Sequence, residues 1–440
     1  MTDKPLAAVV MAAGLGTRMR SALPKHLHPL LGRRLVDWVI LAAQASGAGR
    51  VVVVTSPDAR DAFDGLEVAV QEQPLGTGDA VRAARAALGG FDGDMLVLNG
   101  DVPGLTSELL RALVETHRGE GAAATVLSFE PPDMRSYGRI VRDGKRRLEK
   151  IVEAGDASPK ELALAEVNSG IYVFQAAKLW PALERLEPHN AQGELYVTDT
   201  VGFLVADGDP VSVHVAADPF EAEGINTRSE FAAAAARLRD GINEVHMLAG
   251  VTIVDPATTW IEADVEIEPD VTIHPFVYLR GSTTVASGAV IHAHTVATDA
   301  EIGTRAVLGP FCYLRPGTVI EADSKAGTFV EIKNSRIGPN AKVPHLSYIG
   351  DAEIGEDTNI GAGAITANFP HKTAPKGKTK IGKNVRTGVQ NAFVAPVEVG
   401  DGAWTAAGSV ITKDVPEDAL AVARARQENK EGYAARHRDD

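Results

Sequence analysis

A six-residue rhythm of aliphatic side chains in the second half of the chain is the feature that most limits the folds open to it. Aliphatic residues stand at every sixth position from Ile267 to Ile291 and again from Ile302 to Ile320. The same register resumes further on, with two polar gaps, at Ile381, Thr387 (gap), Phe393, Val399, Thr405 (gap) and Ile411. An α-helix needs spacings of three and four instead. The rhythm therefore predicts a parallel β-helix, in which each short strand points one apolar side chain inward.

One insertion interrupts this rhythm between Thr366 and Ile381, where the chain reads ANFPHKTAPKGKTK. Insertions in a solenoid form loops on one face and often carry the binding site. The segment from Pro370 to Arg386 contains six Lys or Arg and no acid. It is either a phosphate-binding loop or a solvated charged loop.

The first half follows a different pattern. From Leu6 to about Ala217, short β-branched runs alternate with helical patterns, which predicts βαβ units and a mainly parallel sheet. Strands are expected at 6–11, 51–55, 95–98 and 123–128, and helices at 35–45, 79–88 and 109–117. The fold class is thus α/β, followed by a β-helix.

A chain of 440 residues is longer than one hydrophobic core usually organises. The segment from Thr227 to Leu248 is rich in helix formers and reads as a connecting helix. We predict an α/β domain over residues 1–226, a linker helix over 227–249 and a β-helix domain with a C-terminal tail over 250–440.

Charge and cysteine content restrict the partners and the compartment. A formal net charge of -14 argues against a general nucleic-acid binder, which needs a positive field. Cys312 is the single cysteine, so no intramolecular disulfide can form and a reducing compartment fits. The apolar run near the start is far shorter than the ~20 residues of a membrane span. We expect a cytoplasmic protein that does not bind membranes.

A glycine-rich turn, GLGTRM (Gly14 to Met19), follows the first expected strand and precedes Lys25. Glycines let the backbone approach a phosphate, and Arg18 and Lys25 supply positive charge. The turn is neither a P-loop nor a dinucleotide fingerprint, because Met19 stands where the third glycine belongs.

Further motifs make the first half resemble the nucleotidyltransferases that produce nucleoside-diphosphate sugars. They are LPK (23–25), LGTGDA (75–80), LNGD (98–101), YGRI (137–140), IVE (151–153), EVNSGIY (166–172) and GIN (224–226). Asp101 ends an expected strand, where open α/β sheets place ligand residues, and a carboxylate suits Mg²⁺.

The resemblance implies the roles of particular residues. Asp101 and Asn226 would be the metal ligands for Mg²⁺. UTP and the UDP-sugar would be held by Ala12, Ala13, Gly14, Gly16, Lys25, Gln71, Gly76, Thr77, Gly138, Glu153, Asn168 and Asn226. A sugar-1-phosphate oxygen would attack the α-phosphorus of UTP and release pyrophosphate. Positioning, and charge neutralisation by Mg²⁺, Arg18 and Lys25, would account for most of the catalysis, without a general base.

Four motifs of the second half extend the resemblance over nearly the whole chain. FCYLRPGT (311–318), GTFVEIKNS (327–335), KVPHLSYIGDAEIG (342–355) and NIGAGAITAN (359–368) resemble the bifunctional N-acetylglucosamine-1-phosphate uridylyltransferase/glucosamine-1-phosphate acetyltransferase family. The resemblance implies a Rossmann-like domain, a left-handed β-helix and a homotrimer. It also implies two-step synthesis of UDP-N-acetylglucosamine for peptidoglycan and lipopolysaccharide, with acetyl-CoA as acyl donor.

Acetylating an amine needs a base, and an imidazole can serve at neutral pH. By resemblance His345 is that base, and glucosamine 1-phosphate is held by Arg315, Lys333, Tyr348 and Asn359. Acetyl-CoA would contact Ala362, Asn368, Phe369, Lys376, Val389, Ala407 and Arg424. The chain departs from the family where Phe369 replaces a tyrosine and Val389 replaces a serine, which removes a hydroxyl donor.

Two other interpretations are open at this point. The chain could be a single-activity sugar-1-phosphate nucleotidyltransferase whose β-helix only regulates or oligomerises it. It could also be a catalytically silent scaffold with both folds retained. Consumption of acetyl-CoA distinguishes the first from a two-site enzyme, and binding of UTP with Mg²⁺ tests the second.

Overall fold

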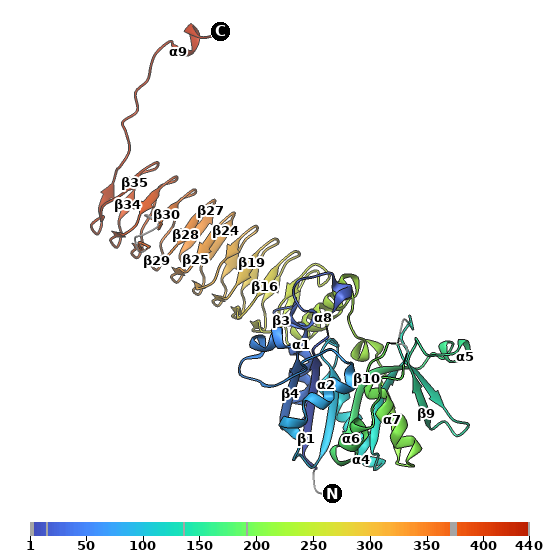
Figure 1. The fold of residues 1–440 in the computed structure, drawn as a ribbon. Coiled ribbons are helices and arrows are strands. Elements are labelled where there is room, and N and C mark those ends of the chain that lie inside the picture. The colour runs from blue at the N-terminus through green and yellow to red at the C-terminus, as the bar shows by residue number, and fades with distance from the viewer. Residues whose placement is uncertain (1–3, 15, 135–136, 191, 370–375, 439–440) are drawn as a thin grey trace. The chain divides into compact units, whose positions relative to one another are not determined.

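The computed structural model describes residues 4–14, 16–134, 137–190, 192–369 and 376–438. The chain forms two compact units, one up to Leu238 and one from Arg239 onwards (Figure 1). None of the helices within the described ranges is both long and apolar enough to cross a membrane.

The first unit is built on a mixed, mostly parallel sheet with the strand order β11-β7-β10-β6-β1-β4-β5. The strands are β1 (Leu6–Ala12), β4 (Arg50–Thr55), β5 (Glu67–Val70), β6 (Asp94–Asn99), β7 (Ala124–Phe129), β10 (Val167–Gln175) and β11 (Val211–Val215). Strand β10 runs antiparallel to β6 and β7, and the hairpin of β8 (Arg139–Arg142) and β9 (Leu148–Val152) extends from it.

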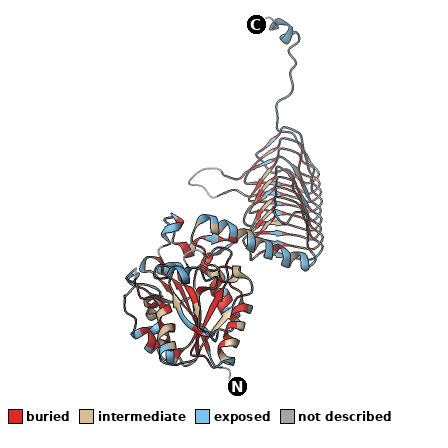
Figure 2. Ribbon diagram, turned by 90° about the vertical axis from the view of Figure 1, so that its right-hand side faces the viewer, coloured by how far each residue is buried: buried red, intermediate tan, exposed pale blue. Residues whose placement is uncertain are grey.

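Helices cover both faces of this sheet. Alternate residues of β1 enter two separate cores: Ala7 and Val9 face one, and Ala8 and Val10 face the other. The first core includes residues of α2 (Thr77–Ala83), α6 (Ala176–Glu184) and α7 (Val197–Ala206), and the second includes α1 (Leu35–Ala45) and α4 (Ser107–Gly119). Figure 2 shows the buried strands between half-exposed helices. Continuous burial on both faces explains the unbroken apolar run of β1.

The single helix expected over 79–88 is instead two helices, α2 and α3 (Arg85–Leu88). The amide of Ala84 donates to the carbonyl of Val81, 3.1 Å away, and the amide of Ala87 donates to Ala84. These three-residue hydrogen bonds tighten the backbone and break the helix.

The second unit is a parallel β-helix whose coils contribute one strand each to three faces. Face 1 contains β12 (Thr252–Ile253), β15 (Thr272–Ile273), β18 (Val290–Ile291), β21 (Val307–Leu308), β24 (Lys325–Thr328) and β27 (Lys342–His345), and continues through bridges at Asn359 and Arg386 to β34 (Trp404–Thr405) and β36 (Leu420–Ala421). Face 2 contains β13 (Trp260–Ile261), β16 (Tyr278–Arg280), β19 (Val296–Thr298), β22 (Tyr313–Leu314), β25 (Glu331–Lys333), β28 (Tyr348–Gly350), β30 (Ile365–Ala367), β32 (Ala392–Val394) and β35 (Val410–Ile411). Face 3 contains β14 (Glu266–Ile267), β17 (Thr284–Val285), β20 (Ala300–Ile302), β23 (Thr318–Ile320), β26 (Arg336–Ile337), β29 (Ala352–Ile354), β31 (Thr379–Ile381) and β33 (Val397–Val399).

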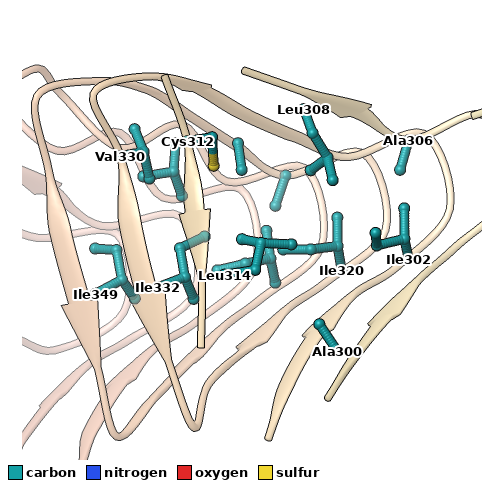
Figure 3. Close-up of a cluster of buried hydrophobic side chains, with 14 of the residues drawn as sticks. Ala300, Ile302, Ala306, Leu308, Cys312, Leu314, Ile320, Val330, Ile332 and Ile349 are labelled. Atoms are coloured by element: carbon teal, nitrogen blue, oxygen red, sulfur yellow. The ribbon is translucent and has the colours of Figure 1, made fainter. Parts of the chain in front are cut away.

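The six-residue rhythm marks the inward positions of these strands. The aliphatic residues of successive coils form one continuous core, as Figure 3 shows for Leu314, Ile332 and Ile349. The two polar gaps are also buried, and their hydroxyl groups accept backbone hydrogen bonds. Thr387 accepts from the amide of Gly361 at 2.7 Å, and Thr405 accepts from that of Gly388 at 3.2 Å. The gaps therefore keep the register without leaving unsatisfied polar groups.

The corner between faces 1 and 2 carries an exposed apolar ladder, which consists of Phe276, His294, Phe311, Phe329 and Leu346. All five residues have a positive φ, which bulky side chains rarely adopt. The rings stack from coil to coil with centroids 4.6 to 5.2 Å apart. The ladder ends at Leu346, directly after His345.

Helix α8 (Arg228–Leu248) occupies the position expected for the linker. Its first half packs Ala234 with Leu30, Leu35 and Ile225 of the first unit. In its second half the amide of Asn243 donates to the carbonyls of Pro256 and Thr259. The division between the two units thus lies within the helix, at 238/239, so each half of α8 belongs to a different unit.

Candidate active sites

Two adjoining cavities open beside the ends of β1 and β6 and meet at Asp101. The larger, about 540 Å³, is lined by Ala13, Gly14, Gly16, Lys25, Gln71, Gly76 and Thr77, among others. The smaller, about 240 Å³, is lined by Arg18, Gly138, Glu153, Asn168 and Asn226, among others. The structure thus brings together, around one cleft, residues that the sequence analysis assigned to UTP and the UDP-sugar. Ala12 is buried as the last residue of β1, where that strand reaches the cleft.

Four polar side chains converge where the cavities meet. The Nζ of Lys25 donates a hydrogen bond to the Asp101 carboxylate and a second, of 3.2 Å, to Oδ1 of Asn226. The same amide oxygen accepts from Arg18 at 2.9 Å. Burial alone raises the pKa of Asp101, but the charge and the hydrogen bond of Lys25, together with His26 and a backbone hydrogen bond, outweigh burial and leave that pKa below its ordinary value. Asp101 is therefore held as a carboxylate.

The backbone around these groups is fixed by the sheet. The amide of Ile225 donates to the carbonyl of Asp101 at 2.9 Å, which brings the GIN motif to the end of β6. A Cβ on Gly224 would lie 3.4 Å from the Asp101 carboxylate. Motifs far apart in sequence thus share one edge of the sheet.

Gln71 and Thr77 form part of a hydrogen-bonded frame around the larger cavity. The Gln71 amide donates to the carbonyl of Gly76 at 3.0 Å and to Asp79 at 2.9 Å. The Thr77 hydroxyl accepts from the amide of Val197 at 3.0 Å. This frame fixes the orientation of the Gln71 carboxamide at the wall of the larger cavity.

The smaller cavity offers a carboxyl and amides for sugar hydroxyls. Asn168 donates to the hydroxyl of Tyr172 at 2.8 Å, and Glu153 accepts from Thr198 at 3.3 Å. Burial raises the pKa of Glu153. A Cβ on Gly138 would lie 3.3 Å from both Glu153 carboxylate oxygens, so a larger residue would crowd that carboxyl group.

His26 is a cleft residue that the sequence analysis did not single out. It lines the larger cavity, and its imidazole lies between Gly14 and Gly100. Burial lowers its pKa to about 4, so the ring is neutral near pH 7. The sequence feature that could have identified His26 is its position directly after the LPK motif (23–25). Asn99, also missed, lines both cavities from within the LNGD motif.

The second candidate site lies on the β-helix, at the corner that carries the apolar ladder. Backbone hydrogen bonds join Gly363 to the carbonyl of His345 (3.2 Å), Gln390 to that of Ala362 (2.7 Å) and Gly408 to that of Val389 (2.9 Å). His345, Ala362, Val389 and Ala407 therefore occupy equivalent positions on four successive coils, and we call them the donor column. Arg424 lies at its end, since a Cβ on Gly408 would be 3.7 Å from the Arg424 side chain.

Face 2 carries a positively charged cluster beside His345. Lys376 lies next to Lys333 and lowers the pKa of Lys333, with a smaller contribution from the charge of Arg315. Arg315 pairs with Glu331 at 2.9 Å. Tyr348 lies on the same face, between this cluster and His345. Lys333 and Lys376 together make this part of face 2 positively charged, which favours the binding of an anion.

Four assigned residues have other surroundings. Asn359 lies on face 1, where it forms parallel β-bridges with Lys342 and Arg386. Tyr348 lies on face 2, on the other side of the corner. Asn368 is buried and donates to Asp351, whereas Phe369 is 68% exposed. Lys376 was assigned to acetyl-CoA, but the structure places it beside Lys333. Residues 370–375 of the basic insertion lie outside the described residues.

Comparisons with known proteins cover both units. Residues 8–198 match the model of the MobA-like NTP transferase domain, and residues 378–413 match the hexapeptide repeat of succinyl-transferase. The chain is 47% identical to the bifunctional protein GlmU of Streptomyces coelicolor, over 99% of this chain and 95% of that protein. It is also 47% identical to that of Leifsonia xyli, over 100% and 95%, and 44% identical to that of Trichlorobacter lovleyi, over 99% of each chain.

Proposed function

The chain belongs to the family of GlmU bifunctional proteins, and from this premise we propose how its residues carry out two transfer reactions. The enzyme makes UDP-N-acetylglucosamine in two steps. The β-helix acetylates glucosamine 1-phosphate, and the first unit then joins N-acetylglucosamine 1-phosphate to the uridylyl group of UTP. The single-activity and silent-scaffold interpretations do not fit a bifunctional family.

For uridylyl transfer, the supporting observation is the meeting of two cavities at Asp101. UTP fits the larger cavity, with its phosphates along the glycine turn and beside Lys25 and Arg18. The sugar phosphate fits the smaller one, so its oxygen faces the α-phosphorus. Lys25 and Arg18 stabilise charge that develops on the phosphate oxygens as pyrophosphate leaves.

Asp101 and Asn226 fit a Mg²⁺ ion. Their oxygen atoms converge on one cation, the Lys25 ammonium, and Mg²⁺ prefers such oxygen ligands. No group of three or more His, Cys, Asp or Glu side chains suited to a metal occurs among the described residues. Two protein ligands suffice where substrate phosphates and water supply the others. Asp101 and Asn226 would hold the ion, which would supply neutralising charge for the phosphates, and the Lys25 ammonium would then turn from Asp101 toward the phosphates.

For acetyl transfer, glucosamine 1-phosphate lies across face 2. Its phosphate contacts Arg315, Lys333 and Lys376, and its amine reaches His345. His345 accepts the amine proton as nitrogen attacks the thioester carbonyl, and the thiolate of coenzyme A leaves and takes up a proton. Tyr348 positions the sugar between these ends. The donor column provides the path for the pantetheine arm, where Ala362 and Ala407 leave room.

We further propose a cytoplasmic homotrimer in which Asn359 serves a neighbouring copy's sugar site. The supporting observations are its place on a different face from Tyr348 and the exposed apolar ladder that adjoins His345. Sedimentation of Phe311→Glu and Phe329→Glu tests this. A wild-type monomer with full acetyl transfer would refute it.

The deciding experiment supplies glucosamine 1-phosphate, acetyl-CoA, UTP and Mg²⁺ to the purified protein and follows free thiol and pyrophosphate separately. Both products and UDP-N-acetylglucosamine are expected. Pyrophosphate that appears only when N-acetylglucosamine 1-phosphate is supplied would show that the acetyl transfer site is inactive.

A further inference from the structure

Face 1 of the β-helix carries a stripe of positive charge whose cations pair with no acidic side chain in the part of the chain that the structure describes. Lys325, Lys342 and Arg386 occupy the same outward column, with Asn359 between the last two. None of the three cations forms an ion pair with any described residue. On face 3, by contrast, cations are paired: Arg336 with Glu321, Lys378 with Glu353 and Lys380 with Glu398. An unpaired stripe on a chain of net charge -14 indicates an anion site.

The stripe ends at an exposed tryptophan. Trp404 follows Arg386 in the column and precedes Leu420. The Trp404 side chain is 59% exposed, and no described aromatic ring or cation covers its face. The Arg386 guanidinium donates only to the backbone carbonyls of Asp357 and Val385. A bare indole beside an arginine with spare donors suits a purine and a phosphate.

The location relates this pair to the donor column. Arg386 and Trp404 lie three residues before Val389 and Ala407 on the same coils, about 10 Å away along an extended chain. Coils are about 4.8 Å apart, so Trp404 lies roughly 17 Å from His345. That separation suits a donor whose thioester is at His345 and whose nucleotide lies at the far end of an extended arm.

We propose that Trp404 and Arg386 bind the nucleotide end of the acyl donor, with the purine stacked on Trp404 and a phosphate group at Arg386. This inference rests on the proposed acetyl transfer. It assigns to face 1 a contact that compensates for the hydroxyl donor absent at Val389.

The test compares two acetyl donors, acetyl-CoA and S-acetylpantetheine, which lacks the nucleotide. Trp404→Ala should raise KM for acetyl-CoA about 10-fold, within the range for loss of one base stack. It should leave kcat and the kinetics with S-acetylpantetheine unchanged. Trp404→Phe keeps an aromatic ring, so its KM for acetyl-CoA should stay close to that of the wild type. Arg386→Gln should behave like Trp404→Ala.

Two control variants define the site. Val410→Ala changes an exposed residue on face 2 and should have no effect. Lys342→Gln removes one charge of the same stripe on the coil of His345, and should change KM by less than twofold. An equal increase of KM in Lys342→Gln and Arg386→Gln would show that the stripe acts through its overall positive charge and not through a contact at Arg386. That result would overturn the proposal.

Direct binding gives a readout independent of catalysis. Adenosine 3′,5′-bisphosphate should bind the wild-type protein in calorimetry, and about 10-fold more weakly to Trp404→Ala. Equal binding to both proteins would overturn the proposal. If the wild type does not use acetyl-CoA at all, the proposed acetyl transfer fails instead.

Discussion

The Lys25 ammonium donates a hydrogen bond to the Asp101 carboxylate, 76 residues further along the chain. Each group is largely buried, with 9% and 17% of the side chains exposed. The positive charge of Lys25 therefore already lies against the Asp101 carboxylate in the substrate-free protein.

Replacing Lys25 with Met should lower uridylyl transfer on the order of a hundredfold or more, because one preorganised charge at the phosphates is lost. Acetyl transfer should be unchanged. The measurement is pyrophosphate release from UTP and N-acetylglucosamine 1-phosphate. Lys178→Met, which removes an exposed pair with Asp209, is the matched control. Retained activity in both Lys25→Met and Asp101→Ala would contradict the assignment.

His345→Ala should reduce acetyl transfer on the order of 10²- to 10⁴-fold, the usual contribution of a general base. Uridylyl transfer should stay at the wild-type rate, because His345 belongs to the other unit. Thiol release and pyrophosphate release on the same sample report both. His274→Gln, on the same β-helix, serves as control, and an unaffected thiol release in His345→Ala would exclude this base.

Val389→Ser should lower KM for acetyl-CoA. Val389 is 49% exposed in the donor column, so serine adds a hydroxyl donor without opening the core. One hydrogen bond contributes about 0.5–1.5 kcal/mol, or roughly a two- to tenfold change in KM. A raised KM would show that the valine side chain itself contacts the donor.

Gly327→Ala should impair acetyl transfer through the backbone. A Cβ at this position would lie 2.1 Å from the carbonyl oxygen of Pro344, next to His345. We expect destabilisation of about 1–3 kcal/mol by overpacking, with a lower kcat for acetyl transfer. Gly241→Ala, in α8 with nothing within 4 Å, should instead stabilise by about 0.5–1 kcal/mol. Similar denaturation midpoints for the two variants would refute the expected clash.

Cys312 gives a pH-dependent prediction for the β-helix. Burial raises the pKa of its thiol to about 12. The unfolded thiol ionises near pH 9, so its contribution to stability is complete below pH 9 and is lost as pH rises towards 12. The urea midpoint of the wild type should therefore fall more between pH 8 and 10.5 than that of Cys312→Ala. Rapid alkylation of native protein by iodoacetamide at pH 8 would contradict this burial.

Much of the fold was predictable because the two periodicities of the chain differ. Inward positions such as Ile273 and Leu314 follow from the six-residue rhythm, and α1 begins and ends at the residues expected. The break at Ala84 was not predictable, because no proline or glycine marks it and it depends on local three-residue hydrogen bonds.

The residues of the candidate sites also divide into those that the sequence predicted and those that it could not predict. Motifs identified Lys25, Asp101 and His345, since each lies at the end of a strand or within a recognisable turn. The place of Lys376 next to Lys333 could not be inferred, because Lys376 belongs to the insertion, where the six-residue rhythm is interrupted. Likewise, Val389 stands above Ala362 because β30 and β32, on either side of the insertion, pair in register.

The stacking of the donor column has a consequence for how this enzyme can change its acyl donor. Each residue of the column is separated from His345 by a whole number of coils, so the positions along the column follow one another at a fixed spacing of one coil. A substitution can change the side chain at one of these positions, but it cannot move the position along the β-helix. A donor with a longer or shorter arm is therefore accommodated only by gaining or losing an entire coil between His345 and Arg424.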